Sequence, residues 1–147
     1  MVDVSGKPVT RREARATARV RMSPEALAGI AAGNLPKGEV LGTARLAGIQ
    51  AAKRCSDLIP MCHPLPLSFV EVDCRVDASQ GWIEIFSTVR CEARTGAEME
   101  ALTAAAVAAL TVVDMAKSAD PWMTIEGLTL LEKSGGKSGS LRRPVAS

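Results

Sequence analysis

Three prolines restrict this chain more than any other feature, because they lie within one short segment, at positions 60, 64 and 66. Proline fixes its own φ and moves the preceding residue out of the helical region. Residues 57–67 can therefore form neither the interior of a helix nor a central strand. We expect a stiff connector that holds the only histidine, His63, beside the thiol of Cys62. A packed loop with a hydrogen-bonded histidine is the more common reason for such a pattern, and a rigid binding segment is the alternative.

Alternating apolar and polar residues predict four strands, each buried on one face. The first covers residues 14–22, where alanine, valine and methionine alternate with arginine and threonine. Residues 68–77 and 82–94 are predicted to form a hairpin. The last strand covers residues 123–132 and is expected to bulge at Gly127.

Three helices are expected between these strands. A Ser-Pro pair at 23–24 predicts the start of a helix that ends near Gly33. A second helix is expected over 38–54, where many small residues indicate close packing, and an alanine-rich third helix over 96–119. If the first two helices form one crossover, the order is β-α-β-β-α-β. This is the plan of an α+β, ferredoxin-like fold with an antiparallel sheet packed on helices.

Composition sets the broad class of the protein. The 147 residues fit one domain at 1–147, with flexible termini expected at 1–13 and 134–147. The net charge of only +2 gives no field that would mark a nucleic-acid binder. Aromatic residues are scarce and alanine is plentiful, so the core is limited and an oligomer is a reasonable hypothesis.

The cysteines indicate a reducing compartment. None of the 4 cysteines has CxxC spacing, and a single histidine cannot complete a usual zinc set with them. We therefore expect free thiols, no metal and a cytoplasmic location. The longest apolar stretch, residues 104–113, is too short to span a bilayer, so no membrane partner is expected.

Charged residues on the third helix suggest chemistry, although each has an ordinary explanation. Asp114 and Lys117 share a face and could form a surface ion pair or a proton-transfer pair. Glu98 and Glu100 could merely complement the helix dipole. Glu100 and Asp114 point in almost the same direction but are about 21 Å apart along the axis. If both serve one site, either the ligand is very long or two subunits share the site, which we favour.

Basic residues are concentrated near the two ends of the sequence. They could form a solvated face and a tail, or they could bind a triphosphate. Lys37 adds a cation near a helix start. The segment 136–138, Gly-Lys-Ser, is not a P-loop, because Leu131 stands where that motif requires glycine and no helix can follow.

Several segments together resemble the MoaC family of molybdenum cofactor biosynthesis. They occur in the family's order over essentially the whole chain: residues 1–7, 37–41, 44–49, 58–65, 94–103, 114–117 and 133–139. The resemblance implies that Asp114 is catalytic, with Lys117 in proton transfer and Lys37 as a second acid or phosphate stabiliser. It also implies substrate contacts from these side chains: Met61, Cys62, His63, Met99 and Glu100. Lys7, Arg12 and Lys133 are weaker candidates for phosphate binding.

The resemblance implies the activity of a cyclic pyranopterin monophosphate synthase. The substrate would be a GTP-derived cyclic nucleotide, (8S)-3′,8-cyclo-7,8-dihydroguanosine 5′-triphosphate, and diphosphate would be released without a cofactor. It further implies a homohexamer, a trimer of dimers with active sites at subunit interfaces. The alternative is a non-catalytic ferredoxin-like module that binds nucleotides or RNA. The RNA version would need exposed aromatic residues on the strands, where only Phe69, Trp82 and Phe86 are candidates.

Overall fold

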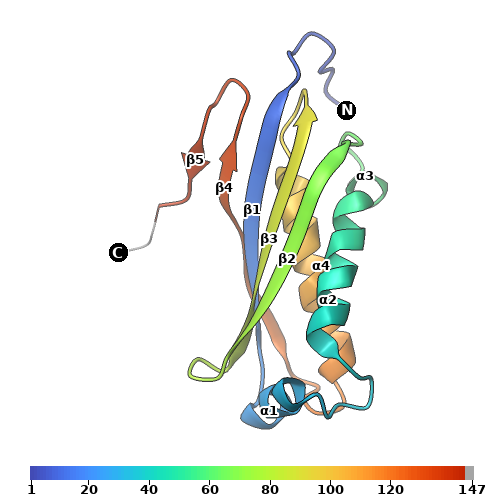
Figure 1. Cartoon of the computed structure of the whole chain (residues 1–147), viewed down its shortest axis with the longest axis vertical. Helices are drawn as coiled ribbons and strands as arrows, with labels where there is room; N and C mark the ends of the chain where they lie inside the picture. Colours follow the sequence, from blue (N-terminus) through green and yellow to red (C-terminus); the bar gives the residue numbers. More distant parts are fainter. Residues whose placement is uncertain (145–147) are drawn as a thin grey trace.

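The central element is a five-stranded antiparallel sheet with the order β2-β3-β1-β4-β5, in a computed structural model that describes residues 1–144 (Figure 1). The strands are β1 (Thr10–Arg21), β2 (Leu67–Asp77), β3 (Trp82–Ala93), β4 (Thr124–Ser134) and β5 (Leu141–Arg142). The first four strands have the pairing expected of a ferredoxin-like sheet. The α+β prediction is therefore confirmed.

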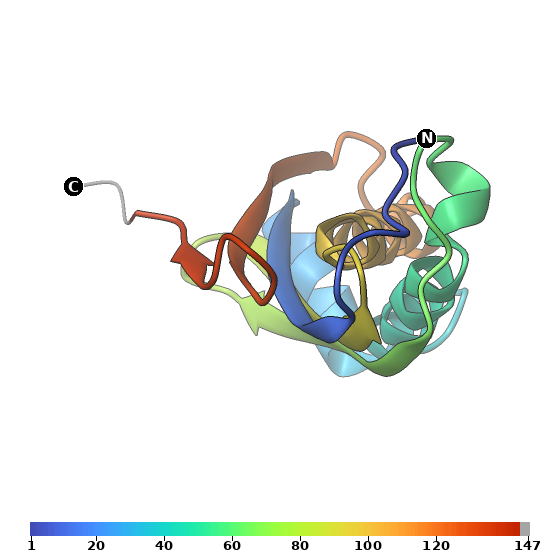
Figure 2. The same ribbon diagram turned by 90° about the horizontal axis from the view of Figure 1, so that it is seen from above.

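The two long helices cover one face of this sheet and leave the other face open (Figure 2). The helices are α1 (Pro24–Ala32), α2 (Val40–Lys53), α3 (Cys55–Leu58) and α4 (Glu98–Ala116). The cap predicted for α1 is present, because the Ser23 hydroxyl accepts a hydrogen bond from the amide of Ala26 at 3.2 Å. α1 and α2 together form the crossover from β1 to β2.

The core lies between the sheet and the two long helices, and small side chains build much of it. The alternation predicted for the first strand is confirmed, since Ala14, Ala16, Ala18 and Val20 are fully buried. They face the alanines of α4, and the larger Ile83 and Ile85 of β3 fill the space beside them. Short side chains bury little area each but let the helix lie close to the sheet.

Close packing of α2 on α4 depends on Gly48. A Cβ at this position would lie 2.8 Å from the carbonyl oxygen of Ala104 and 3.0 Å from Val72 on the sheet. Alanines flank the contact on both helices, as the small residues of α2 indicated. Glycine is therefore the residue that lets three elements meet at one point.

Most of the predicted boundaries shift by one to three residues, and three differences from the sequence-based expectation are larger or add an element. β1 begins at Thr10 rather than at residue 14, because it continues to pair with β3 up to Ala93. The prediction of a non-helical connector over 57–67 is wrong at its start, because Asp57 and Leu58 belong to the helix α3; Pro60 restricts Ile59 but not the turn before it. β5 lies within the tail that we expected to be flexible, and residues 145–147 of that tail lie outside the described residues.

The bulge predicted at Gly127 is present. Gly127 has a φ of 65°, and two residues of β4 oppose one residue of β1 between the pairs Thr17–Thr129 and Arg19–Glu126. Because φ is positive there, glycine is the residue that fits the bulge without strain.

α4 also has the length and hydropathy of a membrane-crossing helix. More than half of that helix is buried against the rest of the protein, which is the property of a core helix. The apolar run within it therefore belongs to the packing of α4 on β1, β3 and α2.

Replacing Gly48 with alanine should destabilise the fold. The added methyl group would meet a backbone carbonyl that cannot move without shifting α4, and overpacking of this kind costs about 1–3 kcal/mol. Urea unfolding would measure the free energy of unfolding. Gly29→Ala is the matched control, because there the near atom is the end of the flexible Leu35 side chain and alanine favours a helix. Equal stability of the two variants would contradict the role given to Gly48.

Candidate active site

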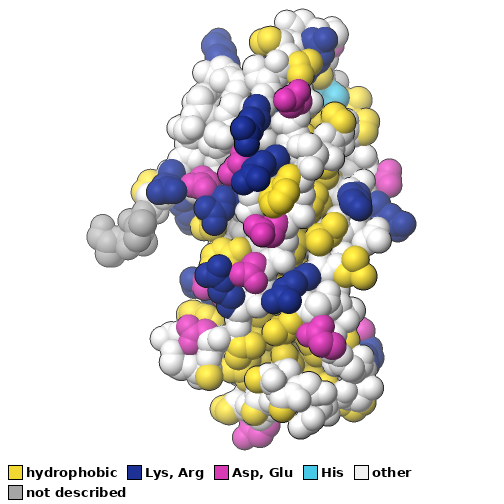
Figure 3. Space-filling model, viewed as in Figure 1, with side chains coloured by type: hydrophobic (Ala, Val, Ile, Leu, Met, Phe, Trp, Pro, Cys, Tyr) yellow, Lys and Arg dark blue, Asp and Glu magenta, His cyan; other side chains and the backbone are white. Residues whose placement is uncertain are grey.

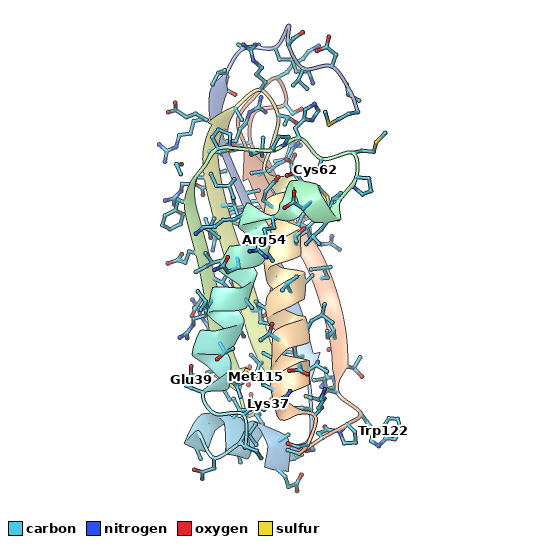
Figure 4. All side chains as sticks on the ribbon, turned by 90° about the vertical axis from the view of Figure 1, so that its right-hand side faces the viewer. Lys37, Glu39, Arg54, Cys62, Met115 and Trp122 are labelled. Carbon is cyan, nitrogen blue, oxygen red and sulfur yellow. The ribbon has the colours of Figure 1, made fainter. Side chains whose placement is uncertain are left out.

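The residues with possible chemical roles form groups at opposite ends of α4. Glu98, Met99 and Glu100 lie in its first turn, whereas Asp114 lies in its last turn. Figure 4 shows the same separation, with Cys62 and Lys37 near opposite ends of the two long helices. One chain therefore does not bring Glu100 and Asp114 together, as the rise of the helix predicted.

At the C-terminal end of α4, two lysines hold the carboxylate of Asp114. Lys37 Nζ lies 2.6 Å from Asp114 Oδ2, and Lys117 Nζ lies 2.8 Å from Asp114 Oδ1. Lys117 comes from the same helix, while Lys37 comes from the loop between α1 and α2. All three side chains are substantially exposed, so a ligand or a second subunit can reach them.

The two lysines set the charge of Asp114. Hydrogen bonds from Lys117 and then from Lys37 lower the pKa of Asp114 to about 2. The carboxylate is therefore ionised at any pH near neutrality and can accept a proton only transiently. A general base works best when its pKa lies near the working pH, so the two lysines keep Asp114 ionised but also lower its basicity.

The loop that carries Lys37 is fixed by the start of α2. The carboxylate of Glu39 accepts hydrogen bonds from the amides of Leu41 and Gly42 at 2.9 and 2.6 Å. Free amides at a helix start can bind an anion, and here the Glu39 carboxylate occupies that position. The ammonium group of Lys37 contacts the carboxylate of Asp114.

At the opposite end of the molecule, cations line a pocket of about 480 Å³. Its lining includes the N-terminal segment, the turn before α4 and the chain that follows β4. The charged residues in the lining are Lys7, Arg12, Arg94, Glu98, Lys133 and Lys137. The three phosphate-binding candidates from the sequence, Lys7, Arg12 and Lys133, therefore lie together around one cavity.

Arg12 reaches this pocket because of its position in β1. It shares the inner face with Ala14, and its guanidinium donates to the carbonyl oxygens of Ala93 and Arg94 at 3.4 and 3.3 Å. Gly136, with a φ of 71°, packs so close to the guanidinium that a Cβ would clash with it. Glycine in this turn lets the segment that carries Lys137 cross over Arg12.

Arg15, Arg19 and Arg21 lie on the opposite face of the sheet. They pair with Glu132, Glu84 and Glu126, each at 2.9 Å. Figure 3 shows such neighbouring positive and negative side chains over the strands. The basic cluster near the start of the sequence therefore divides by face, and these three arginines belong to the solvated face rather than to the pocket.

Beside the pocket, Glu100 is buried next to two thiols. Cys62 Sγ lies 3.4 Å from Glu100 Oε1 and 3.9 Å from Cys55 Sγ. Burial raises the pKa of Glu100, and burial followed by the nearby Glu100 charge raises the pKa of Cys62 to about 12. The four cysteines are free in the described part of the chain, as expected.

The connector places the remaining candidates around this end of α4. Met61 is 69% exposed, Met99 is 38% exposed, and His63 is partly buried. Mobile, polarizable methionine side chains at such a surface can adapt to a flat ring.

Sequence reasoning missed two groups at this end. Arg94 donates to the carbonyl oxygens of Ser5 and Lys7 and so fixes the N-terminal segment over the pocket. The position of Arg94 directly before the Thr-Gly turn at 95–96 is the sequence feature that could have indicated this role. Cys55 lies against Cys62 because α3 turns the chain back, and no spacing rule for metal sites would have paired them.

Comparison with known proteins gives one consistent result. A model of the family described as MoaC family matches residues 1–136. The cyclic pyranopterin monophosphate synthase of Herpetosiphon aurantiacus is 56% identical over 145 residues, which cover 99% of this chain and 88% of that protein. Proteins of the same name from a Methylobacterium and a Roseiflexus species are 61% and 57% identical, and each alignment covers 95% of this chain and 88% of the relative.

Replacing Glu100 with glutamine should raise the melting temperature at pH 8 but not at pH 4. Because burial raises the pKa of Glu100, the folded protein loses stability as pH rises through that pKa, whereas glutamine stays neutral. Below the ordinary pKa of 4.5 both states are protonated, and the difference disappears. Thermal unfolding in metal-free buffer at the two pH values would show an increase of a few degrees at pH 8 only.

The matched control for this prediction is Glu98→Gln on the same turn of α4. Glu98 forms an ion pair with Lys133 at 2.5 Å, so its neutralisation should not stabilise the protein at pH 8. A gain of the same size in both variants would mean that the effect comes from the helix terminus and not from burial of Glu100.

Proposed function

The chain belongs to the MoaC family, and we propose that Asp114, held between Lys37 and Lys117, transfers protons in the reaction of that family. The function of the chain is the synthesis of cyclic pyranopterin monophosphate in molybdenum cofactor biosynthesis. The substrate is (8S)-3′,8-cyclo-7,8-dihydroguanosine 5′-triphosphate, and diphosphate leaves when the cyclic phosphate closes. The observation that carries the proposal is the carboxylate bracketed by two ammonium groups.

The reaction needs groups of this kind. Opening and rebuilding rings around a guanine moves several protons, and closure of the cyclic phosphate requires a hydroxyl to lose a proton as it attacks the α-phosphorus. An ionised carboxylate can accept that proton, while the lysines donate hydrogen bonds to the phosphate oxygens or the leaving group. Asp114 is therefore assigned to proton transfer, with Lys117 and Lys37 as its partners.

We assign the triphosphate to the pocket at the other end of the molecule. Five cations and one carboxylate line it, which gives a positive balance suited to a polyphosphate. Met61, His63 and Met99 lie on the adjacent surface, with the partly buried Cys62 and the buried Glu100 beneath them. These five residues are proposed to contact the base. This assignment is supported because the N-terminal segment, the connector and the start of α4 lie at the same end of the folded molecule.

We further propose that two subunits complete each active site, in a cytoplasmic homohexamer arranged as a trimer of dimers. Fourteen residues of helix separate Glu100 from Asp114, so one compact substrate cannot contact both from one chain. Leu46 of α2 and Leu110 of α4 are 59% and 57% exposed, and a neighbouring subunit could cover them. The small core gives an additional physical reason to bury surface between subunits.

The sheet offers little support for the RNA-binding alternative. Its aromatic rings are covered by guanidinium groups: Arg90 lies 4.5 Å from the centre of Phe69, Arg75 lies 5.0 Å from Phe86, and Arg19 lies 4.5 Å from Trp82. Bases would have to displace these arginines before they could stack.

Asp114→Asn should abolish turnover while the fold is retained. The change removes the charge and the proton acceptor but keeps the shape, so product formation should fall by at least about 10²-fold. The control is Asp73→Asn, because Asp73 is also a solvent-accessible carboxylate between two cations, although it is partly buried; Arg75 lies at 2.7 Å and Arg45 at 3.7 Å. Near-normal synthesis of the cyclic monophosphate by a folded Asp114→Asn protein would refute the assignment.

Mixing subunits tests whether two chains share the site. Glu100→Ala and Asp114→Asn proteins should each be inactive, and co-expressed mixtures should regain activity at interfaces that pair an intact Glu100 end with an intact Asp114 end. The control mixture combines Asp114→Asn with the double variant, in which no interface can be intact. Mixed oligomers that form but regain no more activity than this control would show that the site belongs to one chain.

A further inference from the structure

The carboxylate of Glu100 has an unusual environment. The residue is 2% exposed, and its Oε2 atom has no hydrogen-bond partner among the described residues. A buried carboxylate oxygen without a partner is costly, and native structures seldom keep one without a reason. Its Oε1 atom accepts a hydrogen bond from the thiol of Cys62, and the thiol of Cys55 belongs to the same cluster.

The two thiols stand at a distance that a tetrahedral metal site requires. Metal–sulfur bonds of about 2.3 Å and a metal–oxygen bond of about 2.0 Å place such ligand atoms roughly 3.5–3.8 Å apart. Here Cys55 Sγ and Cys62 Sγ are 3.9 Å apart, and Cys62 Sγ is 3.4 Å from Glu100 Oε1. One ligand atom from each of the three residues lies within 4.8 Å of the others.

Rigid elements hold all three ligands in place. Cys55 begins α3 directly after α2, and Ile59 closes that turn by donating its amide to the carbonyl oxygen of Cys55 at 2.9 Å. The amide of Cys62 then donates to the carbonyl oxygen of Ile59 at 3.0 Å. The connector therefore returns the second thiol to the first, above the first turn of α4, with little freedom to separate them.

We propose that Cys55, Cys62 and Glu100 form a binding site for one thiophilic divalent cation of the zinc class. Two sulfur ligands and one carboxylate supply three of four tetrahedral positions, and the fourth stays available for water or another ligand. Cys55 and Glu100 close the buried side of the site, whereas the partly buried Cys62 connects it to the surface.

The electrostatics of the cluster favour such a cation. Without one, burial raises the pKa of all three groups, and the nearby charge of Glu100 raises the pKa of both thiols further. A divalent cation would reverse this repulsion, because it binds the thiolate forms and releases their protons. It would also provide an electrostatic partner for the Oε2 atom of Glu100, which accepts no hydrogen bond among the described residues.

Cobalt titration of the full, reduced chain tests the site without substrate. We expect one Co²⁺ per chain, a thiolate-to-cobalt charge-transfer band, the strong visible bands of tetrahedral cobalt, and displacement by Zn²⁺. Cys55→Ser, Cys62→Ser and Glu100→Gln should each weaken binding at least about tenfold. Cys74→Ser is the matched control, since Cys74 is another buried thiol but lies on β2 away from the cluster.

Several results would overturn the proposal. These are a wild-type cobalt spectrum without thiolate bands, an equal loss in Cys74→Ser and Cys55→Ser, or a stable Cys55–Cys62 disulfide in place of metal binding. The wild-type spectrum decides the question even if a variant fails to fold, and circular dichroism identifies such a variant. Because substrate is absent, these readouts are independent of the proposed reaction, which the Asp114→Asn experiment tests separately.

Discussion

The contact of α2 with α4 at Gly48 is the constraint on which the rest of the structure depends. Because no side chain separates Gly48 from the carbonyl of Ala104, both helices can lie flat on the same face of the sheet. Alanine on β1 and α4 serves the same purpose along the whole contact. α4 is packed along its length against the sheet and α2. It presents Glu100 at one end of the molecule and Asp114 at the other, and neither position can drift toward the other.

The arginines of the sheet have different contacts on its two faces. On the outer face, Arg15 and Arg19 pair with Glu132 and Glu84, and Arg90 covers the ring of Phe69. Arg12 lies on the other face of β1, together with Ala14, and its side chain lines the pocket. Lys133 leaves β4 on the same side. Arg12 and Lys133 are therefore the two basic residues of the sheet that line the proposed polyphosphate pocket, and its other cations come from loops.

Much of the fold could be predicted from residue patterns, because alternation reports burial and prolines and glycines mark the boundaries. The separation of Glu100 from Asp114 also followed from the rise of a helix. Contacts between distant segments could not be predicted in this way. Lys37 meets Asp114 across 77 positions of sequence, and the return of Cys62 to Cys55 depends on a single turn of helix before Pro60. The family resemblance identified the candidate site residues, but their contact partners could be seen only in the three-dimensional structure.

The helix α4 also explains how sensitive the site should be to changes in length. Each residue of an α-helix turns the chain by about 100°. A one-residue insertion between Glu100 and Asp114 would therefore turn the carboxylate away from Lys37, while Lys117 would turn with it. The parts of the helix before and after the insertion would keep their amino-acid composition and their helix propensity. The number of residues between Glu100 and Asp114 therefore fixes the relative orientation of two distant surfaces. An insertion or deletion would preserve that orientation only if it added or removed about a whole helical turn.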